Sequence, residues 1–400
     1  MSMRKLSAVI GANYGDEGKG LATDFLSNKN TLVVRYNSGA QAGHTVVTPD
    51  GSRHVFHHFG SGTLKGASTF LSEHFAIHPM FFGKELQELR ALGARPEVYI
   101  DPHALITTPY DVMINQALEM SRGNARHGSC GMGFNETIQR CTTSKLFKLD
   151  YLDAYQPNDY LIKLKDIRKY YVPLRLEEFN LPKDSLPHLD DDRILDRFVR
   201  DTELVMANAK PIMWKVISLL WKDDIVFEGA QGLLLDMNSR DFPHVTRSKT
   251  GLHNVVTMME QADIKEELHA HYITRTYLTR HGAGPMPHEM KSGLPYSRVK
   301  DETNVYNPHQ EHLRLGYLNK HKLISEILQD LRNARNVEVI PNLFMTCVDQ
   351  LEKDEYINFF NESGVFGIEH YKEFARSITT KIEGKSTFFS NGNTREYVFT

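Results

Sequence analysis

The chain has 400 residues and a formal net charge of −3. This length leaves room for two domains or for one large α/β domain. The near-neutral balance gives no electrostatic case for binding nucleic acid or a membrane surface, so any polyanion site must be local. Three cysteines are too few for a disulfide framework and have no metal-site spacing, which suits a reducing compartment.

The N-terminus leads directly into an apolar run and shows no signal-peptide pattern. No apolar segment approaches the roughly twenty residues that span a bilayer. We therefore expect a cytoplasmic enzyme whose partners are small molecules, with no nucleic acid and no membrane.

The first third of the chain alternates apolar runs with glycine-containing loops. A buried strand is expected at residues 8–10, a glycine-rich turn at 11–20 and a helix at 21–26. The further elements expected here are a strand at 31–36, a loop at 39–44, a hairpin with strands at 45–48 and 53–59, a helix at 79–92, a strand at 96–100 and a loop at 123–133.

Residues 150–222 are charged and mostly helical in pattern, which indicates a helical lobe on the α/β core. The elements expected after it are strands at 224–228 and 271–280, a long loop at 288–312, a helix at 320–333, and strands at 337–340 and 343–346. The alternation favours one α/β unit over residues 1–400, with a large, mostly parallel central sheet and helices on both faces. Ligands bind such sheets at the carboxyl ends of the strands.

The turn at 11–20 has the pattern of a phosphate-binding loop between a strand and a helix N-terminus. It departs from the common P-loop motif, which would need glycine at Asn13 and a hydroxyl at Gly20. Lys19 supplies a cation for phosphates, whereas Asp16 and Glu17 are unexpected there. A carboxylate in this loop would repel a polyphosphate unless it binds Mg²⁺ or takes part in the chemistry.

Five segments together resemble the adenylosuccinate synthetase family in order and spacing. They are residues 11–20, 34–45, 227–232, 242–246 and 279–287. Members of that family use GTP to join L-aspartate to C6 of the purine of IMP, in purine nucleotide biosynthesis. The resemblance therefore implies a ligase that phosphorylates O6 of a 6-oxopurine nucleotide and then forms a carbon–nitrogen bond.

The resemblance also implies catalytic roles for particular side chains. Asp16 would be the base and a Mg²⁺ ligand, and the carbonyl of Gly43 would complete the metal shell. Lys19 would hold the transferring phosphoryl group, and His44 would donate to the oxygen between the phosphates. Gln231 would contact the purine or its O6.

A larger set would bind the two nucleotides. Its expected members are Gly15, Glu17, Gly18, Gly20, Gln41, Ser129, Cys130, Arg140, Thr246, Arg314, Asp349, Ser390 and Gly392. Thr246, Ser129 and Cys130 would lie near the monophosphate. Arg140 matches the family arginine that reaches the nucleotide of the partner subunit, which implies a homodimer.

The chain departs from the family at the aspartate and donor-base loops. Of the family's arginine cluster for aspartate only Arg314 remains clearly, and Thr303 and Asn304 could help to rebuild the site. Cys347 replaces the lysine beside the base-reading Asp349. The acceptor is therefore IMP or dGMP, since a phage branch of the family acts on dGMP, and the donor is GTP or ATP. The alternatives are a purine-nucleotide phosphohydrolase, or a nucleotide-binding regulator, that has lost the aspartate site.

Overall fold

A computed structural model describes residues 4–300 and 312–400 of the chain. Its centre is a ten-stranded sheet in which every neighbouring pair is parallel except β18 and β19. In spatial order the strands are β19 (Val398–Phe399), β18 (Ser386–Ser390), β15 (Val339–Thr346), β11 (Leu268–Arg275), β1 (Leu6–Gly11), β10 (Ile225–Gly232), β2 (Leu32–Arg35), β5 (Ser68–Leu71), β7 (Val98–Ile100) and β9 (Lys210–Pro211). The expected large, mostly parallel sheet is confirmed.

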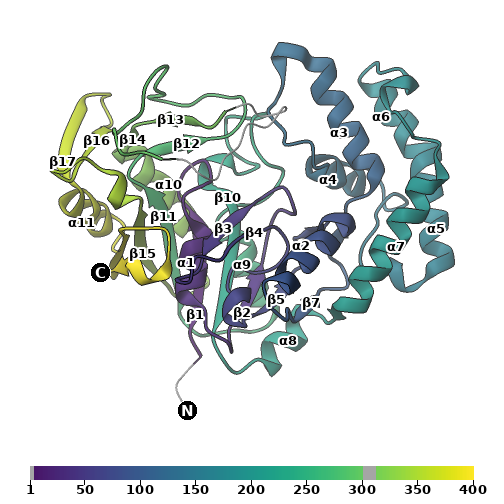
Figure 1. Ribbon diagram of the computed structural model, residues 1–400, viewed down its shortest axis with the longest axis horizontal. Coiled ribbons are helices and arrows are strands. Elements are labelled where there is room, and N and C mark those ends of the chain that lie inside the picture. Colours follow the sequence, from purple (N-terminus) through teal and green to yellow (C-terminus); the bar gives the residue numbers. More distant parts are fainter. Residues whose placement is uncertain (1–3, 301–311) are drawn as a thin grey trace.

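Helices cover both faces of this sheet, as expected (Figure 1). Along β1, Ala8 and Ile10 pack into a large apolar cluster with α8 to α11, whereas Val9 points to the opposite face and packs with α1. The helices are α1 (Lys19–Leu26), α2 (Pro79–Ala91), α3 (Pro109–Arg122), α4 (Phe134–Thr143), α5 (Pro157–Asp166), α6 (Val172–Glu178), α7 (Asp192–Asn208), α8 (Trp214–Leu220), α9 (His253–Gln261), α10 (Lys320–Arg332) and α11 (Tyr371–Lys381). Both faces of β1 are therefore buried, which explains its uninterrupted apolar run.

The helical lobe differs in extent from the expected 150–222. Figure 1 shows α3 to α7 gathered beside one end of the sheet. A separate apolar core joins residues from Ile106 to Phe198 and includes α3, and α4 is joined to α3 through the Arg140–Asp111 ion pair, so both helices belong to the lobe. Trp214 and Ile217 of α8 pack instead against the central sheet. The lobe therefore begins earlier and ends earlier than the charged stretch indicated.

Smaller strands complete the fold. They are β3 (His44–Val47), β4 (Arg53–Phe56), β6 (Ala76–Ile77), β8 (Leu105–Ile106), β12 (Leu278–Arg280), β13 (Arg314–Gly316), β14 (Leu318–Asn319), β16 (Tyr356–Phe360) and β17 (Phe366–His370). The hairpin of β3 and β4 is confirmed. The expected strand at 271–280 is two strands, β11 and β12, and the two expected at 337–346 are one, β15. No helix in the described ranges is long and apolar enough to cross a membrane.

Candidate active site

The glycine-rich turn lies at the carboxyl end of β1, between that strand and α1. Gly15 and Gly18 have φ of 90° and 96°, a region that L side chains rarely adopt. A Cβ on Gly18 would lie 3.0 Å from the Thr346 side chain of β15. The Thr346 hydroxyl also donates to the carbonyl of Glu17 over 2.8 Å. The turn is therefore pressed closely against a strand from the far end of the chain.

Glu17 holds the turn from inside rather than facing a ligand. Its carboxylate is buried, accepts from the backbone N–H of Asn13 and of Gly15 over 3.1 and 2.7 Å, and lies 2.5 Å from Lys19 Nζ. Such a carboxylate satisfies loop donors that would otherwise point into the protein. The expected nucleotide contact for Glu17 is therefore replaced by a role in shaping the loop.

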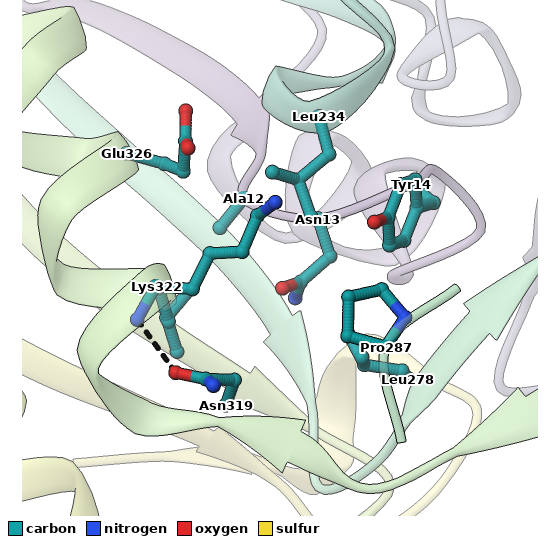
Figure 2. Close-up of a pocket in the computed structure, with 10 residues that line it drawn as sticks. Ala12, Asn13, Tyr14, Leu234, Leu278, Pro287, Asn319, Lys322 and Glu326 are labelled. Atoms are coloured by element: carbon teal, nitrogen blue, oxygen red, sulfur yellow. Dashed lines mark hydrogen bonds between the residues drawn. The ribbon is translucent and has the colours of Figure 1, made fainter. Parts of the chain in front are cut away.

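The back of the turn is closed by packing, as Figure 2 shows. Ala12, Asn13 and Tyr14 face Leu278, Pro287 and the first turns of α10 across a cavity of about 10 Å³, at most room for one water. Asn13 Nδ2 donates to Thr274 Oγ1 over 2.9 Å, and the Arg280 guanidinium lies 4.5 Å from the centre of the Tyr14 ring. Ligands must therefore approach the turn from its other side.

That other side is a cleft of about 1220 Å³ at the carboxyl edge of the sheet. Loops after β1, β2, β10, β15 and β18 border it together with the helical lobe, as expected for a parallel sheet. Of the predicted residues, those that line it are Gly15, Asp16, Gly18, Lys19, Gly20, Gln41, Gly43, His44, Ser129, Cys130, Gln231, Thr246, Asp349 and Gly392. Segments far apart in the chain therefore meet in one cavity: Asp16 and Gly392 are separated by 376 positions.

Asp16 stands at the edge of the cleft with Arg275 beside it. The carboxylate accepts from Arg275 Nη2 over 2.8 Å, and the Asp16 carbonyl accepts from Arg275 Nε over 2.6 Å. About a fifth of the Asp16 side chain (21%) remains exposed. Sequence reasoning missed Arg275, although its place at the carboxyl end of a buried strand was a signal that could have found it.

His44 is oriented by a buried carboxylate. Its Nδ1 lies 2.7 Å from Glu228 Oε1, and Glu228 also accepts from the backbone N–H and the hydroxyl of Ser61. Burial lowers the pKa of His44 to about 4, against the opposing effect of Glu228. Arg35 and His44 outweigh burial and lower the pKa of Glu228. The neutral imidazole therefore donates from Nδ1 to the carboxylate, and the Glu228 charge would stabilise an imidazolium.

The second ring nitrogen of His44, Nε2, has no hydrogen-bond partner within the described part of the chain. Nε2 is buried, while the histidine itself lines the cavity. A buried polar atom of this kind is costly unless a ligand satisfies it. The geometry thus reserves Nε2 for a bound group.

Arg140 does not reach outward. The side chain is fully buried, and Nε and Nη2 donate to Asp111 of α3 over 2.9 Å. Nη1 and Nη2 donate further to the carbonyls of Phe147 and Ile106. The expected contact with a partner subunit is therefore corrected: in this conformation Arg140 joins α4 to α3 inside its own chain.

Two more predicted residues lie off the cleft. Arg314 forms a two-point ion pair with Glu289, over 2.7 and 2.5 Å, and donates to the carbonyls of Gly282 and Gly284. Ser390 is buried and donates to the carbonyl of Gly392. Both shape the loops around the cavity instead of lining it. Thr303 and Asn304 lie outside the described residues.

Several basic side chains that the sequence analysis did not select also border the cleft. They are Arg53, Arg122, Arg175, Arg247, Arg275, Arg280 and Lys300. Arg247 follows Thr246 directly, and Arg280 is part of the motif at 279–287. The motifs could therefore have identified both arginines as site residues. The local positive charge suits an anionic ligand in a chain whose overall charge is slightly negative.

A parallel sheet, a glycine-rich loop at a helix start and a basic cleft define a nucleotide-binding α/β enzyme. The sequence profile described as adenylosuccinate synthetase matches residues 8–381. The chain therefore belongs to the adenylosuccinate synthetase family, which confirms the expected class of ligases that form a carbon–nitrogen bond.

Curated relatives agree with this assignment. The adenylosuccinate synthetase of Ectopseudomonas mendocina is 31% identical over 299 residues, which are 72% of this chain and 66% of that protein. The Pseudomonas fluorescens enzyme is 29% identical over 364 residues, 89% of this chain and 80% of that protein. The matched region thus spans about two thirds or more of each.

Two solved structures share the fold. Fully ligated adenylosuccinate synthetase from Plasmodium falciparum aligns with a TM-score of 0.77 at 18% identity, over 98% of this chain and 99% of that one. Succinoaminodeoxyadenylate synthetase of cyanophage S-2L, bound to dGMP and to dATP as energy donor, aligns with a TM-score of 0.64 at 13% identity, over 99% and 95%. At these identities the likeness concerns the fold alone.

Proposed function

We propose that the protein uses a purine nucleoside triphosphate to join L-aspartate to C6 of a 6-oxopurine nucleotide. Family membership supports the reaction class. The observation that carries the proposal is that Asp16, Lys19 and His44 line one cleft, with Asp16 inside the phosphate loop. A carboxylate that faces the cleft from a phosphate cradle would repel the phosphates unless it binds Mg²⁺ or takes part in the chemistry.

The reaction needs a base because the oxygen at C6 is a poor leaving group. Asp16 would take the proton from purine N1, and the O6 anion would attack the terminal phosphorus of the donor. Lys19 would hold the phosphoryl group in transfer. His44, protonated beside the bound phosphates to an imidazolium that Glu228 stabilises, would donate from Nε2 to the departing oxygen. The amine of aspartate would then displace phosphate from C6. Gln231, which lines the same cleft at φ 66°, would contact the purine.

The donor set of the cleft fits Mg²⁺. The Asp16 carboxylate and the Gly43 carbonyl are hard oxygen ligands on the cleft, and Mg²⁺ commonly takes only one or two protein ligands beside phosphates and water. Within residues 4–300 and 312–400 there is no cluster of three or more His, Cys, Asp or Glu side chains that could hold a metal. Asp16 and Gly43 would therefore hold an ion that arrives with the triphosphate and neutralises its charge.

The base of the donor would bind near the turn that follows β15. Cys347, Asp349 and Gln350 line the cleft there, and so do Gly392 and Asn393 after the neighbouring strand β18. Asp349 could accept from N1 and N2 of guanine. GTP and ATP remain the two donors to be compared, with IMP and dGMP as acceptors.

The aspartate end is the less specified part of the site. Arg314, the expected arginine, already has Glu289 and two carbonyls as partners.

A homodimer belongs to the proposal on the family resemblance alone, because Arg140 is engaged within its own chain. A cytoplasmic location likewise stays a prediction from the sequence.

The test is a ligation assay with Mg²⁺ and each pairing of IMP or dGMP with GTP or ATP, with and without L-aspartate. We expect an aspartate-dependent rise at the absorbance of the succinylamino-purine for at least one pairing. Phosphate release that is the same without aspartate would replace the ligase with a phosphohydrolase. Tight triphosphate binding without any turnover would indicate a regulator.

A further inference from the structure

A continuous row of hydrogen bonds joins Asp16 to the turn after β15. Arg275 is the last residue of β11 and uses all three guanidinium nitrogens: Nε and Nη2 donate to Asp16, and Nη1 donates to the Tyr277 hydroxyl over 2.9 Å. The Tyr277 hydroxyl in turn donates to Gln350 Oε1 over 2.6 Å. Gln350 ends the short helical turn Val348–Gln350, which borders the cleft.

The chemistry of these groups fixes the direction of the row. A guanidinium has donors only, so the Tyr277 oxygen must accept from Arg275. Its hydrogen is then directed at the Gln350 carbonyl oxygen, which identifies the orientation of that amide. Burial raises the pKa of Tyr277, so the hydroxyl keeps its hydrogen. Each link therefore depends on the one beside it, as in other buried polar networks.

The same part of the chain also contacts the phosphate loop and the segment between β11 and β12. Thr346, next to the turn, donates to the Glu17 carbonyl, and the Thr276 hydroxyl donates to the Cys347 carbonyl over 3.2 Å. Cys347 itself has φ of 62°, a conformation that costs a non-glycine residue of the order of 1 kcal/mol or more. A shift of the turn at 347–350 would therefore move both the backbone of the phosphate loop at Glu17 and the side chain of Asp16.

We propose that Arg275, Tyr277 and Gln350 are positioning residues that set the Asp16 carboxylate according to the state of the turn at 347–350. This rests on the proposed function, in which Asp16 is the base and the turn receives the donor base. A donor whose base holds residues 347–350 in the conformation described above would align Asp16 for proton removal. A donor that leaves the turn displaced would bind with Asp16 out of place, so that donor choice would be expressed in the rate of the chemical step.

We call the row from Asp16 through Arg275 and Tyr277 to Gln350 the relay. A double-mutant cycle tests it, with kcat measured at saturating donor. Tyr277→Phe removes one hydroxyl and Gln350→Met removes its acceptor. We expect each to lower kcat about tenfold while the KM of the acceptor changes less than about threefold, because a misplaced base affects the rate more than acceptor binding. The double variant should lose no more than about twofold beyond either single one, because both break the same row.

Tyr296→Phe is the matched control. Tyr296 is a buried tyrosine whose ring centre lies 6.4 Å from that of Tyr277. Its hydroxyl accepts from the Asn358 N–H and donates to the Thr276 carbonyl over 3.4 Å, so it touches the same segment without being a link in the row. Its kcat should stay within about twofold of the wild type. Losses that multiply in the double variant, or an equal loss in Tyr296→Phe, would overturn the relay.

A binding measurement separates this inference from the proposed function. Wild-type protein without aspartate-dependent turnover in all four pairings would end the proposed function. The relay is then judged by calorimetric binding of Mg²⁺ with non-hydrolysable GTP and ATP analogues. Tyr277→Phe and Gln350→Met should each weaken the better analogue about threefold or more, without adding in the double variant. Unchanged or additive affinities would refute the relay, whatever the turnover.

Discussion

The charged side chains at the carboxyl edge of the sheet border the cleft, whereas, among the described residues, those on its flanks contact only other parts of the chain. Asp16, Lys19 and His44 each have a partner within the chain, yet each also borders the cleft. Arg140, Arg314 and Asp330 direct their polar atoms to neighbours inside the chain and lie off the cleft. A charged residue in a motif therefore indicates a ligand contact only after its internal partners are known.

The comparison predicts that the first group controls turnover and the second controls stability. The largest effect is expected for Asp16→Asn, which keeps the shape but removes the base. The kcat should fall by about 10² to 10⁴, as for the loss of a general base, while the thermal midpoint changes little. Steady-state kinetics with the best donor and acceptor provides the measurement. A variant with near-normal turnover would remove Asp16 from the chemistry.

Arg140→Met should act in the opposite way. It leaves the buried Asp111 carboxylate without its cation, which costs about 3–5 kcal/mol in the free energy of unfolding. Denaturant titration measures this loss. The double variant Arg140→Met with Asp111→Asn should regain part of it, because the amide carries no charge and keeps an acceptor for the Thr108 N–H that caps α3. A large loss of kcat in a variant that remains folded, with unchanged stability, would instead return Arg140 to the active site.

Asp330 sharpens the comparison because no cation faces its carboxylate among its described contacts. It accepts from the Leu252 N–H and the Tyr272 hydroxyl, and burial raises its pKa from 3.8 to about 6. The folded protein thus holds this proton more tightly than the unfolded chain. Stability should fall by about 3 kcal/mol as the pH rises through that interval, and the loss should persist above it.

Asp330→Asn is the control for this pH dependence. The amide keeps an acceptor for Leu252 and can still pair with the Tyr272 hydroxyl, but it does not ionise. Its free energy of unfolding, measured by denaturant titration between pH 4 and about 7, should lack the part of the slope that Asp330 contributes. Parallel curves for the two proteins would show that Asp330 does not titrate in this range.

His44→Ala should lower kcat by about 10², because it removes the group that would donate to the departing oxygen. Glu228→Gln should lower kcat less, since the imidazole keeps a hydrogen-bond partner but loses the neighbouring charge. Unchanged kcat in Glu228→Gln at every pH would show that orientation alone, and not the charge of Glu228, matters to His44.

The smallest effect is expected for Arg314→Ala. Its ion pair with Glu289 is partly exposed, and such pairs contribute up to about 1 kcal/mol. The thermal midpoint should fall by a few degrees while the KM of aspartate stays within about twofold. A KM that rises by tenfold or more would show that Arg314 leaves Glu289 to bind aspartate.

Much of the fold could be predicted from the sequence because its signals are local. The apolar runs at β1, β2 and β10 and the turn between β3 and β4 mark their elements directly. The limits of the helical lobe could not be predicted, since α3 and α8 both carry apolar residues and only tertiary packing decides which core each one joins. The two strands expected at 337–340 and 343–346 are one, because β15 continues through Pro341.

In the site, too, residues with local sequence signals could be predicted and contacts between distant segments could not. Asp16, Lys19 and His44 were identified from motifs whose spacing reflects the loop itself. The burial of Arg140 could not be anticipated, because Asp111 lies 29 positions away and no local pattern links the two. The position of Arg275 at the end of a buried strand could have marked it as a cleft residue, but its contact with Asp16 spans 259 positions and has no local signal.

The strand order has a consequence for how the protein is made. Both neighbours of β1 in the sheet come from beyond residue 224, and the residue that presses on its loop is Thr346. A ribosome that has completed half of the chain has therefore produced the phosphate loop without either strand that pairs with β1 and without Thr346. The loop can take its shape only after nearly the whole polypeptide has emerged, and such long-range pairing is slow. We expect release of the active fold to lag behind synthesis, with the unpaired edges of β1 as the part most in need of chaperones.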